Sequence, residues 1–331
     1  MRKYIWQLLL VCSLSVTSIA INLQSQSDTD PTPAPTKTTI SPESTSSPET
    51  GTNNIEPFTQ SDLNVLTGNV QRPNGIAWHN ENLYAVCNGD WTLYELDDTN
   101  GDTETYIFGV RNAHTLHIET TSETEFDLWI PDYDVNALLR VNRIRAPEQI
   151  ATGLEGPWGI VVFDEQTFLI TNIQGNNLVS VTKSGEVTQL IDGLRAPTGL
   201  AINEDFVFLA NNGSARRSIE WVLREELSDG ESEPVLQPLV NGLQNTTGLL
   251  LADDGYLYFS YAIGRRGVIG RINPVECMDG GCTNDQVEIV VYTELDAPLA
   301  GMTISPDMRL YFHTIFRPEI YWIELPESVT S

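Results

Sequence analysis

One short motif recurs six times along the chain. Its clearest copies follow the pattern Pro-x-Gly-apolar, at residues 73–76, 157–160 and 197–200. Weaker copies lie at residues 246–249 and 299–302, and a degenerate copy lies at 113–116. The third positions of successive copies are 40 to 53 residues apart. A near-constant period of this length indicates a fold built from repeated supersecondary units.

Each repeat continues with the same series of short strands. An apolar segment follows each motif, as in residues 83–86 and 257–259. A polar turn comes next, then an alternating strand such as 178–181, and finally a strand that ends in a glycine turn, such as 189–194. Four short strands per repeat are the pattern of a β-propeller blade. The sequence therefore predicts an all-β fold, a six-bladed β-propeller with four antiparallel strands per blade. A β-sandwich does not explain six copies of one motif.

The two ends of the repeat region predict how the ring closes. Residues 64–68 match the last strand of a blade, although they precede the first blade. The final unit, residues 298–325, supplies only three strands. We therefore expect the N-terminal strand to complete the sixth blade, which hides an edge strand that would otherwise promote aggregation. The propeller is predicted to span residues 57–327, with a tail at 328–331.

The N-terminal segment predicts export. Arg2 and Lys3 precede a mostly apolar stretch, and residues 18–20 have the small-x-small form of a signal-peptidase site. We interpret residues 1–20 as a signal peptide, with an uncleaved anchor as the alternative. Residues 21–56 are rich in Ser, Thr and Pro and poor in large apolar side chains, so we expect a disordered linker. The protein is therefore expected to be secreted or exposed at the cell surface.

The charge balance argues against some classes of partner. The chain has 45 acidic and 18 basic residues, which gives a formal net charge of −27. Nucleic acids and anionic membranes are recognised by clustered Lys and Arg, so neither is expected as a partner. Contact with a membrane is expected only through an uncleaved N-terminal anchor, and we expect a monomer.

Two cysteines predict a disulfide bond. Cys277 and Cys282 bracket a short glycine-containing segment in an insertion of the fifth repeat. In an exported chain, such a pair usually closes a loop through a disulfide, and a two-cysteine metal clip is the less favoured alternative. Cys87 ends an apolar strand, and we expect it to be a buried free thiol.

Two segments carry a resemblance to known propellers. The sequence RPNGIA at residues 72–77, followed by NLYAV at 82–86, resembles the blade motif of the gluconolactonase/regucalcin-like family and of NHL-repeat propellers. Residues 253–272 resemble the same group and the related sugar-dehydrogenase-like propellers. The resemblance covers residues 57–327. Because this superfamily contains lactonases, lyases, quinone-dependent dehydrogenases and binding modules, it implies a fold rather than one activity.

The propeller geometry also predicts where a functional site lies. The start of each innermost strand and the end of each second strand meet on one face, around the mouth of the central channel. We expect ligand-binding residues at these positions: Asn74, Trp158, Asn172, Thr198, Asn211, Tyr261 and His313. His114 is a candidate general acid or base, because histidine titrates near neutral pH. A polar histidine with purely structural hydrogen bonds is the alternative.

Three oxygen-bearing side chains are candidate metal ligands. The family resemblance implies a metal held by a Glu in Glu-Gly-Pro, an Asn in Asn-Gly and an Asp after a second strand. Glu155 and Asn74 match the first two motifs, and Asp132 could supply the third ligand. Such a set suits Ca²⁺ or another divalent cation. Their order along the chain departs from the family, and Asn and Asp after a strand are also ordinary turn residues.

These features support two hypotheses about function. The first is a binding module whose channel mouth takes a small molecule, a glycan or a protein and contains no catalytic group. The second is a divalent-metal-dependent hydrolase of sugar lactones, with the three candidate ligands and His114 as acid or base. A quinone-dependent sugar dehydrogenase is less favoured, because only Arg111 and Arg195 are basic candidates at the mouth. Apart from the cation, no cofactor is expected.

Overall fold

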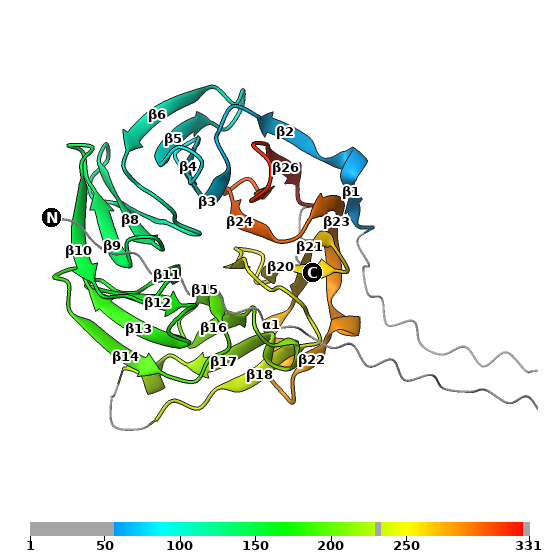
Figure 1. Ribbon diagram of the computed structural model, residues 1–331. Coiled ribbons are helices and arrows are strands. Elements are labelled where there is room, and N and C mark those ends of the chain that lie inside the picture. Colours follow the sequence, from blue (N-terminus) through cyan, green and yellow to red (C-terminus); the bar gives the residue numbers. More distant parts are fainter. Residues whose placement is uncertain (1–55, 229–232, 327–331) are drawn as a thin grey trace, which may run out of the picture. The chain divides into compact units, whose positions relative to one another are not determined.

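The computed structural model describes residues 56–228 and 233–326. In this part of the chain, the strands form six small sheets arranged as the blades of a ring (Figure 1). This arrangement confirms the predicted six-bladed β-propeller. The predicted signal peptide (1–20), the predicted linker (21–56) apart from Glu56, and the predicted tail (328–331) lie outside the described residues. None of the described helices has the length and apolar character that a membrane span requires.

Each blade is an antiparallel meander of four strands that starts beside the channel and runs outward. Blades one to three use consecutive strands: β3 (Pro73–His79), β4 (Asn82–Cys87), β5 (Thr92–Asp97) and β6 (Thr103–Phe108), then β7 (His117–Thr120), β8 (Phe126–Asp132), β9 (Ala137–Val141) and β10 (Pro147–Thr152), then β11 (Pro157–Asp164), β12 (Thr167–Asn172), β13 (Asn177–Thr182) and β14 (Val187–Ile191).

Blades four to six take one strand each from elsewhere in the sequence. Blade four contains β15 (Pro197–Ile202), β16 (Phe206–Asn211), β17 (Ile219–Leu223), β18 (Gln237–Asn241) and β22 (Cys282–Thr283). Blade five contains β19 (Leu249–Leu251), β20 (Leu257–Ile263), β21 (Arg266–Ile272), β23 (Glu288–Asp296) and β1 (Phe58–Thr59). Blade six contains β24 (Leu299–Ile304), β25 (Arg309–Thr314), β26 (Ile320–Glu324) and β2 (Asn64–Thr67).

The ring closes as the sequence predicts. Strand β2 pairs antiparallel with β26, with Val65 opposite Tyr321, and so supplies the fourth strand of blade six. Figure 1 shows the blue β2 beside the red β26. Leu66 of this strand is buried in the cluster between blades six and one. The two ends of the described chain are therefore joined by backbone hydrogen bonds in one sheet.

Two short strands were not predicted from the sequence. Strand β1 pairs parallel with β23, and β22 pairs parallel with β18. Strand β22 belongs to the insertion between β21 and β23, where Cys277 and Cys282 form the predicted disulfide. This insertion therefore adds a fifth strand to blade four. The short helices of the described chain are η1 (Gln60–Asp62), η2 (Ala215–Arg217), η3 (Glu225–Leu227), α1 (Pro274–Cys277) and η4 (Asn284–Gln286).

The hydrophobic core lies between neighbouring blades. Leu66, Leu83 and Tyr311 belong to the cluster between blades six and one. Phe208 and Phe259 belong to the cluster between blades four and five, which also contains the disulfide. Each such large side chain contributes about 1.5–3 kcal/mol when it is fully buried. Cys87 is buried and has a free thiol, as expected.

The glycines of the repeated motif lie where adjacent inner strands approach most closely. A Cβ atom added to Gly75 would lie 2.8 Å from the carbonyl oxygen of Ala113 in the connection to blade two. At Gly199 it would lie 2.7 Å from the carbonyl oxygen of Thr247 beside blade five. Because backbone atoms cannot move aside cheaply, only glycine fits these positions. The motif thus specifies the packing of the ring around its axis.

A second set of contacts connects the inner strands from blade to blade. Threonine hydroxyls donate hydrogen bonds to carbonyl oxygens of the next blade: Thr115 to Trp158 at 2.6 Å, Thr198 to Thr246 at 2.9 Å, and Thr247 to Leu299 at 3.2 Å. These bonds supply hydrogen-bond donors to carbonyl groups at the channel wall.

Candidate functional site

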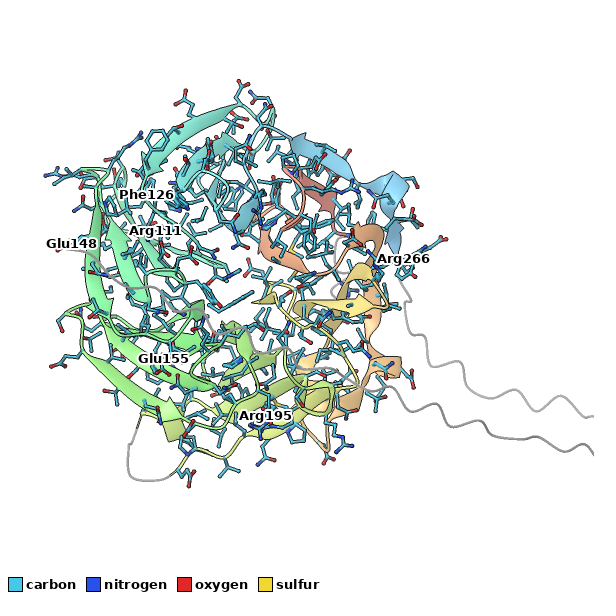
Figure 2. The ribbon with its side chains drawn as sticks, viewed as in Figure 1. Arg111, Phe126, Glu148, Glu155, Arg195 and Arg266 are labelled. Carbon is cyan, nitrogen blue, oxygen red and sulfur yellow. A yellow bond between two sulfur atoms is a disulfide. The ribbon has the colours of Figure 1, made fainter. Side chains whose placement is uncertain are left out.

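One face of the propeller carries the connections that surround the channel mouth. In an antiparallel meander, the loop between the second and third strands and the connection to the next blade lie on the same side. We call this side the mouth face; its loops are residues 68–72, 88–91, 109–116, 133–136, 153–156, 173–176, 192–196, 212–218, 242–248, 264–265, 297–298 and 315–319. Figure 2 shows Arg111, Glu155 and Arg195 following one another around the ring of blades.

Buried polar atoms without hydrogen-bond partners gather at the mouth. Among the described residues, they include Asn74 Oδ1, His114 Nδ1, Trp158 Nε1 and His313 Nδ1, which come from four different blades. Of all such atoms, only those of Trp221 and Arg309 lie away from the mouth face. Most buried polar atoms in proteins are hydrogen-bonded, so a group of unpartnered ones marks a place where a ligand or water binds.

His114 is held by aromatic contacts rather than by hydrogen bonds. Its ring stacks on the indole of Trp158, with ring centroids 3.3 Å apart, and meets the ring of Tyr133 edge-on at 5.6 Å. Only 9% of His114 is exposed. Burial, together with the nearby His313, lowers the pKa of His114 to about 3. Its imidazole is therefore neutral at neutral pH.

His313 connects blade six to blade one. Its Nε2 atom lies 2.9 Å from the carbonyl oxygen of Asn74 and 3.2 Å from the amide nitrogen of Gly301. Complete burial lowers the pKa of His313 to about 4, so this imidazole is also neutral at neutral pH. The Asn74 side chain donates in turn to Asn112 Oδ1, and Asn112 Nδ2 donates to Asp134 Oδ1 at 3.1 Å. These contacts bring Asn74 and His313 together and place them close to His114.

Three predicted site residues use their side chains to hold loops. The carbonyl oxygens of the Asn172 and Asn211 side chains accept the backbone N–H groups of Glu155 at 3.3 Å and Arg195 at 3.0 Å. Asp132 does the same for the backbone N–H of Arg111 at 2.7 Å. In blades two, three and four, the polar residue that ends the second strand therefore fixes the preceding connection between blades. These contacts give the three residues a structural role.

The remaining predicted binding residues are also buried. Thr198 belongs to the hydroxyl-to-carbonyl contacts between blades. Tyr261 packs against Phe259, with ring centroids 5.9 Å apart, and burial raises the pKa of its hydroxyl to about 12. The structure therefore brings together His114, Trp158, Asn74 and His313 as one group at the channel mouth.

The candidate metal ligands do not form a cage. Both carboxylate oxygens of Asp132 accept backbone N–H groups: Oδ2 that of Arg111, and Oδ1 those of Asp134 at 3.1 Å and Val135 at 3.4 Å. Glu155 is exposed in a separate loop. The described residues contain no group of three or more His, Cys, Asp or Glu side chains able to hold a metal ion. Because Ca²⁺ needs six to eight oxygen ligands, these contacts do not fit a cation site.

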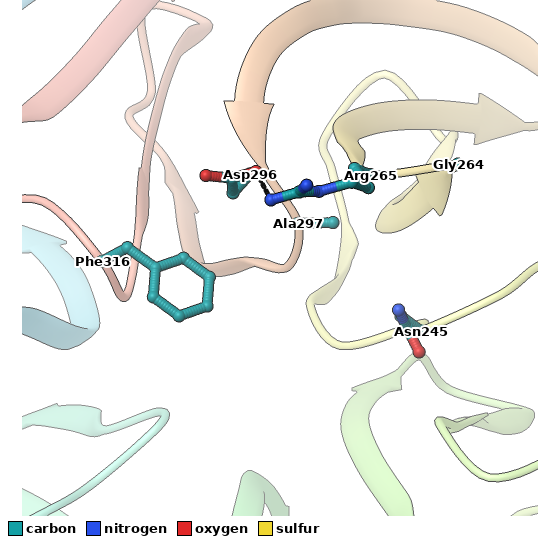
Figure 3. Close-up of a pocket in the computed structure, with 6 residues that line it drawn as sticks. All are labelled: Asn245, Gly264, Arg265, Asp296, Ala297 and Phe316. Atoms are coloured by element: carbon teal, nitrogen blue, oxygen red, sulfur yellow. Dashed lines mark ion pairs between the residues drawn. The ribbon is translucent and has the colours of Figure 1, made fainter.

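A cavity that sequence reasoning missed opens over blades five and six. It has a volume of about 320 Å³ and is lined by Asn245, Gly264, Arg265, Asp296, Ala297 and Phe316 (Figure 3). Arg265 and Asp296 form an ion pair at 3.5 Å across it. The side chain of Phe316 is 58% exposed although it is large and apolar. An aromatic residue in a turn is the one signal in the sequence that could have indicated this cavity.

Comparisons with known proteins identify the architecture. No family profile and no curated protein matches the chain. Among solved structures, a gluconolactonase from Xanthomonas campestris gives a TM-score of 0.62 at 14% identity, over 80% of this chain and 89% of that chain. A calcium-binding regucalcin from Agrobacterium tumefaciens gives 0.58 at 12% identity, over 82% and 96%. The PQQ-bound aldose sugar dehydrogenase from Streptomyces coelicolor gives 0.56 at 13% identity, over 79% and 96%.

The fold is shared. The predicted resemblance to gluconolactonase- and regucalcin-like propellers agrees with these structures. At identities of 12% to 14%, however, the likeness concerns the fold alone. Propellers of one architecture perform many unrelated functions, so a function for this chain has to be argued from its own site.

Proposed function

We propose that the protein binds a hydroxyl-rich small molecule, or the end of a glycan, at its channel mouth. The observation that carries the proposal is the group of unpartnered buried polar atoms from four blades. Trp158 Nε1 can only donate a hydrogen bond, and Asn74 Oδ1 can only accept one. A hydroxyl group does both, so a ligand with several neighbouring hydroxyls satisfies such a mixed set.

The part of the ligand that enters the channel is uncharged. The imidazoles of His114 and His313 are both neutral at neutral pH because burial lowers their pKa values. Asn74 and Trp158 carry no charge. A charged ligand group placed among these four side chains would lose its hydration without gaining a partner of opposite charge, which is costly.

A panel of mono- and oligosaccharides, screened by calorimetry on the full chain, tests the proposal. We expect the Trp158→Phe variant to bind about tenfold more weakly than the wild type, because it keeps an aromatic ring but loses one hydrogen-bond donor. Trp221→Phe is the matched control, because Trp221 Nε1 is also buried without a partner but lies in β17, away from the mouth. No binding by the wild type, or equal binding by Trp158→Phe, would overturn the proposal.

A divalent-metal-dependent sugar lactonase is the second candidate. It is supported by the likeness to the gluconolactonase and by the Asn-Gly and Glu-Gly-Pro motifs at Asn74 and Glu155. The backbone contacts of Asp132 argue against it. Metal analysis of the purified protein, with lactone hydrolysis measured before and after chelation, distinguishes the two candidates. A bound cation together with chelator-sensitive turnover would favour the lactonase.

A further inference from the structure

The basic residues divide into two sets with different surroundings. On the face opposite the mouth, nearly all of them pair with carboxylates: Arg140 with Asp127, Arg143 with Glu125, Arg145 with Glu95, Lys183 with Glu119, Arg271 with Glu288, and Arg309 with Asp307. Arg224 instead donates to backbone carbonyl oxygens. On this face, nearly all basic side chains therefore form ion pairs or hydrogen bonds within the protein.

On the mouth face, Arg217, Arg265 and Arg266 pair with carboxylates, but several other arginines do not. Exposed arginines without a carboxylate of the described residues within 4.0 Å are Arg72, Arg111, Arg195, Arg216 and Arg317. They belong to loops of blades one, two, four and six, so they surround the channel mouth. In a chain with 45 acidic and 18 basic residues, carboxylate partners are abundant. The mouth face therefore presents guanidinium groups without carboxylate partners in an otherwise strongly acidic protein.

Two exposed aromatic rings accompany these arginines. Trp91 is 53% exposed. The guanidinium carbon of Arg111 lies over its ring, 5.3 Å from the ring centroid. Phe316, which lines the cavity over blades five and six, directly precedes Arg317. Large apolar side chains exposed on one face mark an interaction surface. A flat ring packs against the apolar face of a sugar, while the adjacent guanidinium binds a carboxylate through two parallel hydrogen bonds.

We propose that the mouth face binds an acidic polysaccharide, whose carboxylates contact the unpaired arginines while an uncharged sugar at its end enters the channel. This inference rests on the proposed function and specifies its ligand. The five arginines are spread over four blades, which suits a polymer with well-separated charges. A nucleic-acid duplex carries one charge per about 1.7 Å, which is a denser charge than this arrangement of arginines matches.

The test compares an oligogalacturonate with its carboxyl-reduced counterpart of equal length, by calorimetry on the full chain. We expect the acidic oligomer to bind more tightly at low ionic strength. This preference should largely disappear at about 1 M salt, where the Debye length is ~3 Å. The double variant Arg111→Gln/Arg195→Gln should weaken binding of the acidic oligomer about three- to tenfold and leave binding of the reduced oligomer unchanged. The control Arg143→Gln/Arg145→Gln removes two arginines from the opposite face and should change neither.

The outcomes separate this inference from the proposed function. Equal binding of the two oligomers would overturn the preference for an acidic ligand and leave the proposed function intact. Absence of binding by both oligomers and by every sugar in the panel would overturn both proposals. Tighter binding of a single-stranded DNA of equal charge would also overturn the inference, because it would identify a nucleic-acid surface.

Discussion

The imidazole of His114 lies flat against the indole of Trp158, with their planes 2° apart. Stacking covers one face of each ring and leaves the ring edges as the polar surface. Those edges carry His114 Nδ1 and Trp158 Nε1, both buried without a hydrogen-bond partner among the described residues. The pair thus provides a rigid apolar plane with a polar border, as expected for a site that orients a ligand by few hydrogen bonds.

The first prediction concerns pH. Burial lowers the pKa of folded His114 to about 3, whereas an unfolded histidine titrates near ~6.5. Between these values, the unfolded chain binds more protons than the folded chain, so this residue makes the protein less stable as the pH falls. When the pH is lowered from about 7 to about 5, the free energy of unfolding should therefore fall in both proteins. The fall should be about 2 kcal/mol smaller in His114→Gln than in the wild type.

Urea unfolding at both pH values measures this difference. His79→Gln is the control, because His79 is only partly buried and its pKa is lowered by burial alone. An identical pH dependence in His114→Gln and the wild type would contradict the assignment of His114 as a buried neutral imidazole.

The second prediction concerns ring closure. Leu66→Ala in β2 should reduce the free energy of unfolding by about 2–4 kcal/mol, because it leaves a cavity between blades six and one. Val65→Ala, in the same strand but 57% exposed, should cost less than about 1 kcal/mol. Chemical denaturation of both variants measures the difference. Equal losses would show that β2 does not contribute to the core.

The third prediction concerns the motif glycines. Gly199→Ala places a methyl group against the carbonyl oxygen of Thr247 and should destabilise the protein by about 1–3 kcal/mol. Gly68→Ala is the matched control, because its nearest neighbour would be Glu319 Cγ at 3.9 Å. Thermal unfolding of the two variants gives the comparison. Tolerance of alanine at position 199 would contradict the close approach of blades four and five.

The fourth prediction concerns the disulfide. The Cys277→Ser/Cys282→Ser variant should lose about 2 kcal/mol of stability, because the bond closes only a short loop. The loss should be accompanied by faster amide exchange at Val240, whose partner in the parallel pairing is Cys282. Native exchange rates at Val240 in this variant would show that the insertion holds blade four without the disulfide.

The fold could be predicted because each repeat carries its own packing requirement. The glycines at positions 75, 159 and 199 each lie where adjacent inner strands approach closely, so the recurrence of their motif indicates a repeated blade. Strands β1 and β22 contain two residues each, which is too short for any periodicity to be visible. They form only because the completed ring brings β23 and β18 alongside them.

The site was less accessible to sequence reasoning. Asp132, Asn172 and Asn211 have the residue types of a binding site, yet their side-chain oxygens accept backbone N–H groups of neighbouring loops. The sequence alone does not show which backbone N–H group donates a hydrogen bond to a given side chain. Arg265 and Phe316 come from different blades and are brought together only as lining residues of the cavity, so no local sequence pattern links them. Asn74, His114 and Trp158 could be singled out because they occupy the same motif position in three successive repeats. His313 could be singled out because it lies next to the end of the second strand in the last repeat.

The pairing of β2 with β26 has a consequence for biosynthesis. The ribosome makes β2 near the beginning of the propeller and β26 at its end, so β2 has no partner while the intervening blades are being translated. During that interval, its backbone groups are open to wrong pairing with other nascent chains. A folding helper that shields this segment until translation finishes would raise the yield of correctly assembled protein.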